Sequence, residues 1–271
     1  MFEDQVVVIT GGSSGLGKEL AARFLRRGAR VALIARDPAK LDAVRQALGA
    51  SGRVGAYPCD VADAQAVARA LAAIASEMGR PDVLVNSAGI LHESRFEDES
   101  LAVFREIMDV NFFGTVHCVQ AVLPFFGERG GGRIVNVCSV AGLMTAYGYS
   151  AYCASKHAVA GLTHALRQEL RPRGVQVHLV CPGEFESPMV DKLNAYRSPE
   201  NRAHAQMIPV LSAAAVADAV MKGLERGRFM IVPGAATRLV ERLNRYWPGA
   251  ARAFTDLRLS AVRRKSSGRR A

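Results

Sequence analysis

Short β-branched, apolar runs alternate along this chain with longer segments whose apolar residues recur at helical spacing. The first run covers residues 5–10, and the others cover residues 30–35, 53–59, 83–86, 133–138, 175–180 and 229–232. Helical patterns fill the intervals, the clearest of them at residues 64–78, 101–126 and 213–226. Consecutive strands joined through helices run parallel, and a parallel sheet is covered on both faces. The alternation predicts an α/β fold with one doubly wound parallel sheet of about seven strands.

The size and composition suit one large domain. With 271 residues, of which 49% are hydrophobic, the chain can bury a full core without a second domain. No uninterrupted apolar run approaches the roughly 18 residues of a membrane span, and the start, with Glu3 and Asp4, is acidic where a signal peptide is basic. The five cysteines form no Cys-x-x-Cys pair and the six histidines lack ligand spacing, so we expect reduced thiols and no metal site. We expect the protein to be cytoplasmic.

A glycine-rich turn, Gly11-Gly12-Ser13-Ser14-Gly15-Leu16-Gly17, joins the first apolar run to a helical segment. Such a turn, placed between a strand and a helix, lets backbone N–H groups and the positive end of the helix approach a pyrophosphate. The turn therefore predicts a dinucleotide site that includes Gly11, Ser13, Ser14, Gly15, Leu16 and Gly17.

The ends of the next apolar runs extend this predicted cofactor site. The second run ends on Arg36, where an NAD site would carry an acidic residue, and an arginine suits a 2′-phosphate. A solvated loop charge is the alternative for Arg36. Asp60, with Val61 beside it, follows the third run and can bond an adenine amino group, although a helix cap explains an aspartate there nearly as well. After the fourth run come residues that suit a backbone lying against a cofactor, namely Asn86, Ala88 and Gly89.

Tyr152 and Lys156 lie four residues apart, on one face of a predicted helix. An ammonium about 4 Å from a phenol, at an effective dielectric constant near 20, contributes roughly 4 kcal/mol, which lowers the phenol pKa by about three units. Such a tyrosine can exchange a proton with a carbonyl or alcohol oxygen. Taken alone this spacing is a common accident. Ser139, thirteen residues before Tyr152 at the carboxyl end of the fifth run, supports the catalytic interpretation.

Five motifs taken together resemble the short-chain dehydrogenase/reductase family. They are Thr10-Gly11-x-x-x-Gly15-x-Gly17, Asn86-x-Ala88-Gly89, Asn111, Ser139 and Tyr152-x-x-x-Lys156, and the likeness covers residues 5–233. The resemblance implies a Rossmann-type fold that pairs into homodimers or homotetramers through segments 101–126 and 151–171. It implies that Tyr152 is the general acid and base and that Lys156 is its pKa partner and a ribose ligand. It also implies that Ser139 holds the substrate carbonyl and that Asn111 holds a water of the proton relay.

The same resemblance places Pro182, Gly183 and Ser187 beside the nicotinamide. Ser187 stands where the family usually has threonine, a change that keeps the hydroxyl. Ser14 stands where many NADP-using members have a basic residue. The preference for NADP(H) over NAD(H) therefore rests mainly on Arg36.

Within the family, the segments Ile9-Thr10-Gly11-Gly12-Ser13-Ser14-Gly15, Ala35-Arg36 and Phe96-Glu97-Asp98 are most similar to 3-ketodihydrosphingosine reductases. The polar stretch 184–209 predicts a mobile substrate loop with a short helix. One hypothesis pairs Glu184 or Glu186 in this loop with the ammonium of a keto-sphingoid base, and the alternative is that both are solvated charges. The residues expected at the substrate mouth are otherwise apolar: Leu91, Met144, Tyr147, Phe185 and Met189.

These features predict an NADP(H)-dependent oxidoreductase that interconverts a small hydrophobic ketone and its secondary alcohol. A hydroxysteroid-type dehydrogenase and a 3-oxoacyl reductase are the enzymatic alternatives. A protein that senses NADP or acts as a scaffold without turnover is the alternative from another class. The presence of Ser139, Tyr152 and Lys156 together argues against that last alternative.

The basic character of the chain is concentrated at its end. Residues 225–271 carry a net charge of +9 out of the total +10. Apolar and basic residues fall at helical spacing over residues 238–247, and a second such segment follows Pro248. We therefore divide the chain into a domain of residues 1–233, a basic amphipathic helical extension of residues 234–265 and a disordered tail of residues 266–271. The extension can lie on the inner membrane surface, cover the substrate mouth or pack on another subunit, and we expect no nucleic-acid binding.

Overall fold

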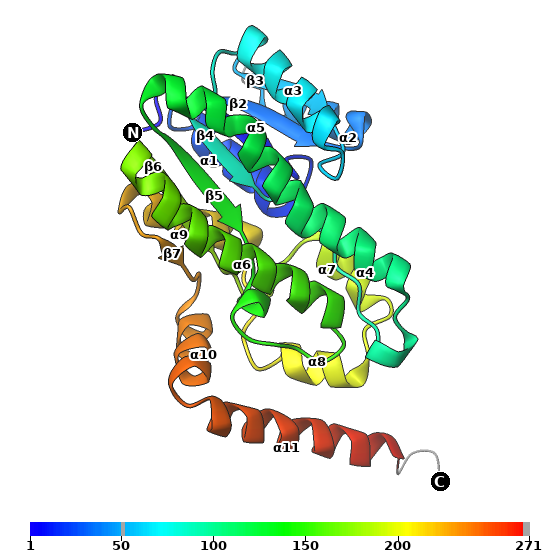
Figure 1. Ribbon diagram of the computed structural model, residues 1–271. Helices are drawn as coiled ribbons and strands as arrows, with labels where there is room; N and C mark the ends of the chain where they lie inside the picture. Colours follow the sequence, from blue (N-terminus) through cyan, green and yellow to red (C-terminus); the bar gives the residue numbers. More distant parts are fainter. Residues whose placement is uncertain (50–51, 268–271) are drawn as a thin grey trace.

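Seven parallel strands form one sheet in a computed structural model that describes residues 1–49 and 52–267. The strand order is β3-β2-β1-β4-β5-β6-β7, with helices on both faces (Figure 1). The strands are β1 (Val6–Thr10), β2 (Arg30–Ala35), β3 (Val54–Pro58), β4 (Val83–Asn86), β5 (Gly132–Val137), β6 (Val175–Val180) and β7 (Met230–Ile231). Each strand end lies within one residue of the predicted position, because β-branched runs bounded by loops mark buried parallel strands clearly. The predicted doubly wound fold is confirmed.

Each face of the sheet carries its own hydrophobic core. One core lies under three helices, α1 (Gly15–Leu25), α2 (Pro38–Leu48) and α9 (Ala213–Glu225). The other lies under α3 (Ala64–Glu77), α5 (Gly114–Arg129) and α6 (Ser150–Leu170). The strands read as nearly continuous apolar runs because they are buried on both sides.

The helical segment predicted at residues 101–126 is not continuous. It consists of α4 (Leu101–Met108), a π-helical turn (Asp109–Phe113) and α5. By length and composition alone, the combined stretch Leu101–Gly127 is apolar enough to cross a membrane, although no uninterrupted apolar run of that length was expected. In this fold, α5 packs against α3 and the strands β4 and β5. A π-helical turn inside a helix often marks a functional site.

The substrate loop predicted at residues 184–209 contains two short helices instead of one, α7 (Pro188–Asn194) and α8 (Pro199–Ala205). We call residues 188–208 the flap. The two ends of the flap meet where Phe185 and Leu211 form an isolated β-bridge, and the Glu186 N–H donates to the Leu211 carbonyl at 2.9 Å. The chain thus leaves the domain core at residue 185 and returns to the same place at residue 211, with the flap between these two points.

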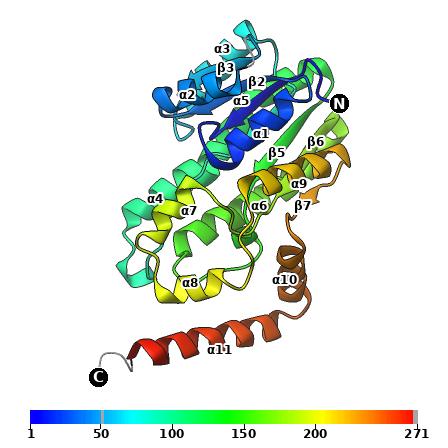
Figure 2. The ribbon, with the colours of Figure 1, turned by 180° about the vertical axis from the view of Figure 1, so that it is seen from behind.

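The carboxyl-terminal extension forms two helices, α10 (Ala235–Tyr246) and α11 (Pro248–Ser267). As predicted, the break falls at Pro248, which occupies the first position of α11, where a missing N–H costs nothing. In both views α11 runs across the end of the molecule beside the flap helix α8, which it contacts (Figures 1 and 2). Of the tail predicted to be disordered, residues 266 and 267 are the last residues of α11, and residues 268–271 lie outside the described residues.

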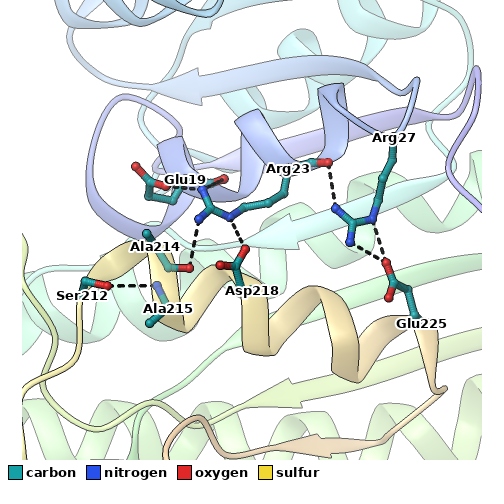
Figure 3. Close-up of polar contacts among 8 residues, drawn as sticks. All are labelled: Glu19, Arg23, Arg27, Ser212, Ala214, Ala215, Asp218 and Glu225. Carbon is teal, nitrogen blue, oxygen red and sulfur yellow. Dashed lines mark hydrogen bonds and ion pairs between the residues drawn. The ribbon is translucent and has the colours of Figure 1, made fainter.

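Helix α1, whose amino-terminal end faces the glycine turn, is held against α9 by a buried arginine (Figure 3). The Arg23 guanidinium, only 7% exposed, donates to Asp218 Oδ1 at 2.9 Å and to the Ala214 carbonyl at 3.0 Å, and also contacts the Glu19 carboxylate. One turn further on, Arg27 Nε donates to Glu225 Oε1 at 2.7 Å in a more exposed pair. These contacts fix the orientation of α1 on the sheet.

We expect Arg23→Ala to lower the free energy of unfolding by about 1–3 kcal/mol, because it removes a buried guanidinium that a partly buried carbonyl and two carboxylates share as their donor. Arg27→Ala is the matched control and should cost no more than about 1 kcal/mol, since that pair is exposed. Urea denaturation measures both values. Equal losses in the two variants would contradict the assignment of Arg23 as the anchor of α1.

Candidate active site

The carboxyl ends of strands β1, β4, β5 and β6 open into one pocket, at the point where the strand order reverses between β1 and β4. The loops after β1 and β4 are joined by the Thr10 hydroxyl oxygen. It accepts hydrogen bonds from the N–H groups of Ser87 and Ala88 at 3.0 and 3.1 Å. A residue from the first glycine motif thus holds the fourth-strand loop in place.

The backbone of the glycine turn packs too closely for side chains. A Cβ on Gly11, whose φ is +66°, would lie 2.8 Å from the Ser87 carbonyl oxygen. A Cβ on Gly17 would lie 2.4 Å from the Gly11 carbonyl oxygen. Both distances are shorter than van der Waals contact, so this turn requires glycine at both positions.

The amino-terminal end of α1 is open to a ligand. Ser14 occupies its N-cap position but makes no side-chain capping bond, whereas Asp37, Asp63 and Ser212 cap α2, α3 and α9 in the usual way. The unpaired N–H groups and the helix dipole of α1 suit an anion. Four residues of the turn line the pocket, namely Gly11, Ser14, Gly15 and Leu16. The cradle fits the pyrophosphate of a dinucleotide.

The remaining predicted cofactor residues fall into two groups. Those that line the pocket are Gly89, Tyr152, Lys156, Pro182, Gly183 and Ser187. Those that do not are Ser13, Gly17, Arg36, Asp60, Val61, Asn86 and Ala88. Within the described part of the chain, the exposed Arg36 makes no hydrogen bond or ion pair, which leaves its guanidinium available. Asp60 caps its own loop by accepting from the Ala62 N–H at 3.0 Å.

Asn86 has a structural role in this arrangement. It is 4% exposed, and its Nδ2 donates to Asn136 Oδ1 at 2.9 Å. Asn136 Nδ2 donates in turn to Thr163 Oγ1 on α6 at 2.9 Å. This buried chain connects β4, β5 and α6, so the asparagine predicted to contact a cofactor holds the sheet to the helix that carries Tyr152.

Tyr152, Lys156 and Ser139 all line the pocket. Tyr152 and Lys156 project from α6, and Ser139 follows β5. The Lys156 ammonium is buried, donates to the Val137 carbonyl at 3.1 Å and lies 5.6 Å from the centroid of the Tyr152 ring. The same helix turn is fixed to β5 by the Cys138 thiol, which donates to the Lys156 carbonyl at 3.1 Å.

The sequence-based expectation that Lys156 lowers the pKa of Tyr152 is not met in this geometry. Burial raises the pKa of the Tyr152 phenol above its usual value, the nearby Cys138 thiol raises it further, and a hydrogen bond with Ser139 lowers it. Burial also lowers the pKa of Lys156. Burial is the largest cause of both shifts, and the Lys156 ammonium donates to the Val137 carbonyl.

Asn111 lies in the π-helical turn and connects three segments of the site. Its Oδ1 accepts from the Ile90 N–H at 2.8 Å. Its Nδ2 donates to the Ile90 carbonyl and to Ser155 Oγ, both at 3.0 Å. The widened turn directs this buried side chain toward α6 and the loop after β4. The predicted role of Asn111 in holding a water remains a prediction.

The predicted substrate residues do not all reach the pocket. Those that line it are Leu91, Met144, Glu184, Phe185 and Met189. Tyr147 and Glu186 lie outside the lining, and the Tyr147 ring packs beneath the Arg263 guanidinium at 5.7 Å. Glu184 forms a bidentate ion pair with Arg197, including an Nη1–Oε1 contact of 3.0 Å. Glu184 is thus paired with an arginine and Glu186 lies outside the lining, an arrangement that disfavours the hypothesis that one of them pairs with a substrate ammonium.

The sequence analysis did not predict three polar residues of the pocket, one that precedes α6 and two on helix α8. Tyr149, Asn201 and His204 line the pocket. Asn201 Oδ1 and His204 Nδ1 are buried polar atoms without a hydrogen-bond partner. The available signal was the spacing of Tyr149, the N-cap residue of α6, three residues before Tyr152.

Two carboxylates fasten the flap. Glu93, 8% exposed, accepts from the Ser198 N–H at 2.9 Å and from the Ser198 hydroxyl at 2.6 Å. The second carboxylate, Glu184, pairs with Arg197, the residue directly before Ser198. Because Ser198 is also the N-cap of α8, Glu93 fixes the start of the helix that carries Asn201 and His204.

A proton donor, a second hydroxyl and a cradle for a dinucleotide thus converge on one pocket. Such a convergence is what hydride transfer between a nicotinamide dinucleotide and a carbonyl compound or alcohol requires. Residues 5–198 match the family model described as short chain dehydrogenase, and the chain belongs to that family.

Curated relatives support the same assignment. The chain is 41% identical over 195 residues to Dehydrogenase/reductase SDR family member 7B of Danio rerio, covering 69% of this chain and 63% of that protein's length. It is 33% identical over 229 residues to the 3-ketodihydrosphingosine reductase of Bos taurus, covering 82% of this chain and 69% of that protein. These relatives bear different names, so they establish the family and no branch within it.

A solved structure has the same architecture. A short-chain dehydrogenase/reductase from Burkholderia phymatum in complex with NAD superposes with a TM-score of 0.81 at 28% identity, covering 90% of this chain and 94% of that chain. The NAD in that structure agrees with the fit of a dinucleotide to the cradle.

The raised pKa of Tyr152 predicts a pH dependence that differs between the two directions. A group with a raised pKa stays protonated below that value, so ketone reduction should be nearly constant from pH 6 to about pH 8. Alcohol oxidation needs the phenolate, so its kcat/KM should rise about tenfold per pH unit over the same range. Steady-state pH profiles in both directions measure this. A plateau in oxidation below about pH 8 would instead show that Lys156 lowers the phenol pKa.

Proposed function

We propose that the protein is an NADP(H)-dependent reductase of a long-chain ketone, with a 3-keto-sphingoid base as its preferred substrate. The observation that carries this proposal is the apolar lining of the pocket around Ser139 and Tyr152. The lining includes Leu91, Met144, Phe185, Met189, Met207 and Ile208. A pocket of this kind favours an alkyl chain over a sugar, because it offers hydrocarbon contact and few hydrogen-bond partners.

The proposed steps use residues that are already in place. A reduced nicotinamide, when bound, supplies hydride to the carbonyl carbon. Tyr152 donates its phenolic proton to the carbonyl oxygen, and Ser139 donates a hydrogen bond to the same oxygen. Lys156 holds positive charge beside the phenol and offers donors to a ribose. The carbonyl gains one hydride and one proton and becomes the secondary alcohol.

Arg36 supports the choice of NADP(H). It follows β2, where the ribose of a dinucleotide lies in this fold class, and its guanidinium makes no other contact within the described residues. An unpaired guanidinium at this position suits a phosphate, which it can bind through two parallel hydrogen bonds. The Ser13 and Ser14 side chains offer no positive charge, so the preference depends on Arg36.

The acceptors on α8 support a substrate with a polar head. Burial and the positive charge of Arg258 lower the pKa of His204, so its imidazole is neutral at neutral pH and can accept a hydrogen bond. Asn201 Oδ1 lies on the same helix and also lacks a partner. These two groups suit the amino and hydroxyl groups beside the ketone of a keto-sphingoid base. We therefore assign the binding of the substrate ammonium to Asn201 and His204 instead of Glu184.

The extent of the similarity also supports the sphingoid proposal. The likeness to the Bos taurus 3-ketodihydrosphingosine reductase covers 82% of this chain, whereas that to the Danio rerio relative covers 69%. The longer alignment extends beyond the family model, which ends at residue 198. The expected homodimer or homotetramer and the cytoplasmic location remain predictions.

The proposal is tested by following NADPH oxidation with 3-ketodihydrosphingosine and with a long-chain ketone that lacks the amine. We expect turnover of both and a preference of about tenfold for the amine-bearing ketone, as for one good hydrogen bond to a charged group. His204→Phe should remove the preference, because it deletes the acceptor and keeps the ring. Tyr152→Phe should lower kcat by about 10²–10⁴-fold while cofactor binding persists. Glu186→Gln, outside the pocket, is the matched control.

Each alternative gives a different result in this assay. Turnover of neither ketone would overturn the substrate proposal, and hydroxysteroids and 3-oxoacyl thioesters would then be tried. Cofactor binding without turnover of any carbonyl would indicate a sensor or scaffold. Unchanged turnover in Tyr152→Phe would overturn the assignment of the proton donor.

Arg36→Ala should raise the KM for NADPH by about tenfold or more and leave the KM for NADH nearly unchanged, because only NADPH carries the 2′-phosphate. Steady-state titration of each cofactor measures this change. Arg45→Ala is a suitable control, since Arg45 is exposed on α2 and paired with Asp42. Equal effects on the two cofactors, or an initial preference for NADH, would contradict the assignment.

A further inference from the structure

The carboxyl-terminal helices expose an unusual amount of apolar surface. Six of the twelve large hydrophobic residues that are exposed in the described chain lie in α10, α11 or the residue between them. They are Leu239, Leu243, Tyr246, Trp247, Phe254 and Leu257. Single exposed apolar residues need no explanation, whereas a contiguous patch marks an interaction surface.

Helix α10 presents this surface as two adjacent stripes. Leu239, Leu243 and Tyr246 follow one another at helical spacing, and Trp247, 62% exposed, ends the stripe. Arg238, Arg242 and Arg245 form a parallel stripe at the same spacing and are also exposed. An aromatic end on such a basic amphipathic helix is typical of helices that lie in a membrane interface.

Helix α11 continues the surface. Its side with Ala251, Thr255 and Val262 is partly buried, as expected for the side that contacts α8. Phe254 and Leu257, the latter 72% exposed, occupy a different side together with Ala261. Thus the contact with the body does not use the most apolar side of the helix. Figure 1 shows α10 and α11 projecting from the end of the domain, with one side free of other elements.

We propose that the outer face of α10 and α11, defined by these six hydrophobic residues and the arginines beside them, binds an anionic lipid surface. Residues 234–265 carry eight Lys or Arg against two Asp or Glu. Arginine side chains can lay their stems along an apolar layer and place their guanidinium groups among anionic headgroups. The aromatic rings of Tyr246 and Trp247 suit the same depth, because each has an apolar body and a polar tip.

Charge disfavours a second copy of the chain as the occupant. A symmetric dimer places the same surface patch of each subunit against the other. The arginine stripe of α10 would then face its own copy, and like charges at an interface oppose association. An anionic bilayer supplies both the apolar layer and the opposite charge.

The position of this face gives the lipid contact a consequence for the active site. Helix α11 packs on α8, and α8 contributes Asn201, His204 and Ala205 to the pocket. Asn244 Nδ2 on α10 donates to the Leu143 carbonyl at 3.4 Å, next to the pocket residue Met144. A bilayer on the outer face would therefore lie beside the flap, so that a substrate dissolved in lipid reaches the pocket without crossing bulk water.

The full-length protein can be tested without any variant, because Trp247 is its single tryptophan. Vesicles of phosphatidylcholine with 30% phosphatidylglycerol should shift the Trp247 emission to shorter wavelength and sediment the protein. Vesicles of phosphatidylcholine alone should bind at least about tenfold more weakly, and salt should weaken binding to the anionic vesicles. Absence of both the shift and sedimentation with anionic vesicles would overturn the proposal.

Variants separate the lipid surface from other occupants. Leu257→Ser and the pair Arg242→Glu with Arg245→Glu should each reduce sedimentation about tenfold or more. Leu101→Ser is the matched control, since Leu101 is also 72% exposed but lies on α4. Sedimentation velocity without vesicles provides the opposing test. Self-association that Leu257→Ser abolishes, with no vesicle binding, would assign the face to a second copy and overturn the proposal.

Discussion

The contact between the glycine turn and the loop after β4 is the constraint on which the site depends. The Gly11 backbone lies so close to Ser87 that no side chain fits between them, and the Thr10 hydroxyl holds both Ser87 and Ala88 by their N–H groups. This contact fixes the opening between β1 and β4, where the strand order reverses. It also sets the position of the uncapped amino-terminal end of α1. Further along this helix, Arg23 attaches α1 to α9 through Asp218. A cradle that fits a dinucleotide thus follows from close backbone packing together with the Thr10 hydroxyl.

A second framework of buried polar groups connects the sheet to the catalytic helix. Asn86, Asn136 and Thr163 form one chain of hydrogen bonds, which ends where Thr163 Oγ1 donates to the Val159 carbonyl at 2.6 Å. Asn111 forms another connection through its bond to Ser155. Buried polar groups that are linked by such hydrogen bonds favour a single arrangement of the elements around them. They determine where Tyr152 and Ser139 meet, although none of them needs to contact a substrate.

Much of this could be predicted from the sequence, for reasons that differ between elements. Buried parallel strands appear in the sequence as β-branched apolar runs, so the ends of the strands could be predicted to within one residue. The glycine turn and the Tyr152–Lys156 spacing are local in sequence, so both could be found. The π-helical turn at Asn111 could not, because an extra residue in a helical turn is stabilised by contacts with Ile90 and Ser155 that are distant in sequence. The direction of the Tyr152 pKa shift was also missed, since spacing predicts the attraction to Lys156 but not the burial that opposes it.

The substrate side was least predictable because it is built from segments without strong periodicity. The flap is closed by one bridge, fastened by Glu93 and by the Glu184–Arg197 pair, and covered by α11. An acidic loop residue therefore acts through an arginine thirteen residues away and does not meet a ligand itself. Helix α8 lines the pocket with Asn201 and His204 and also contacts α11, so it connects the carboxyl-terminal helices to this wall of the pocket. The sheet and α6 carry Ser139, Tyr152 and Lys156, whereas another part of the pocket wall belongs to the flap, which packs against α11.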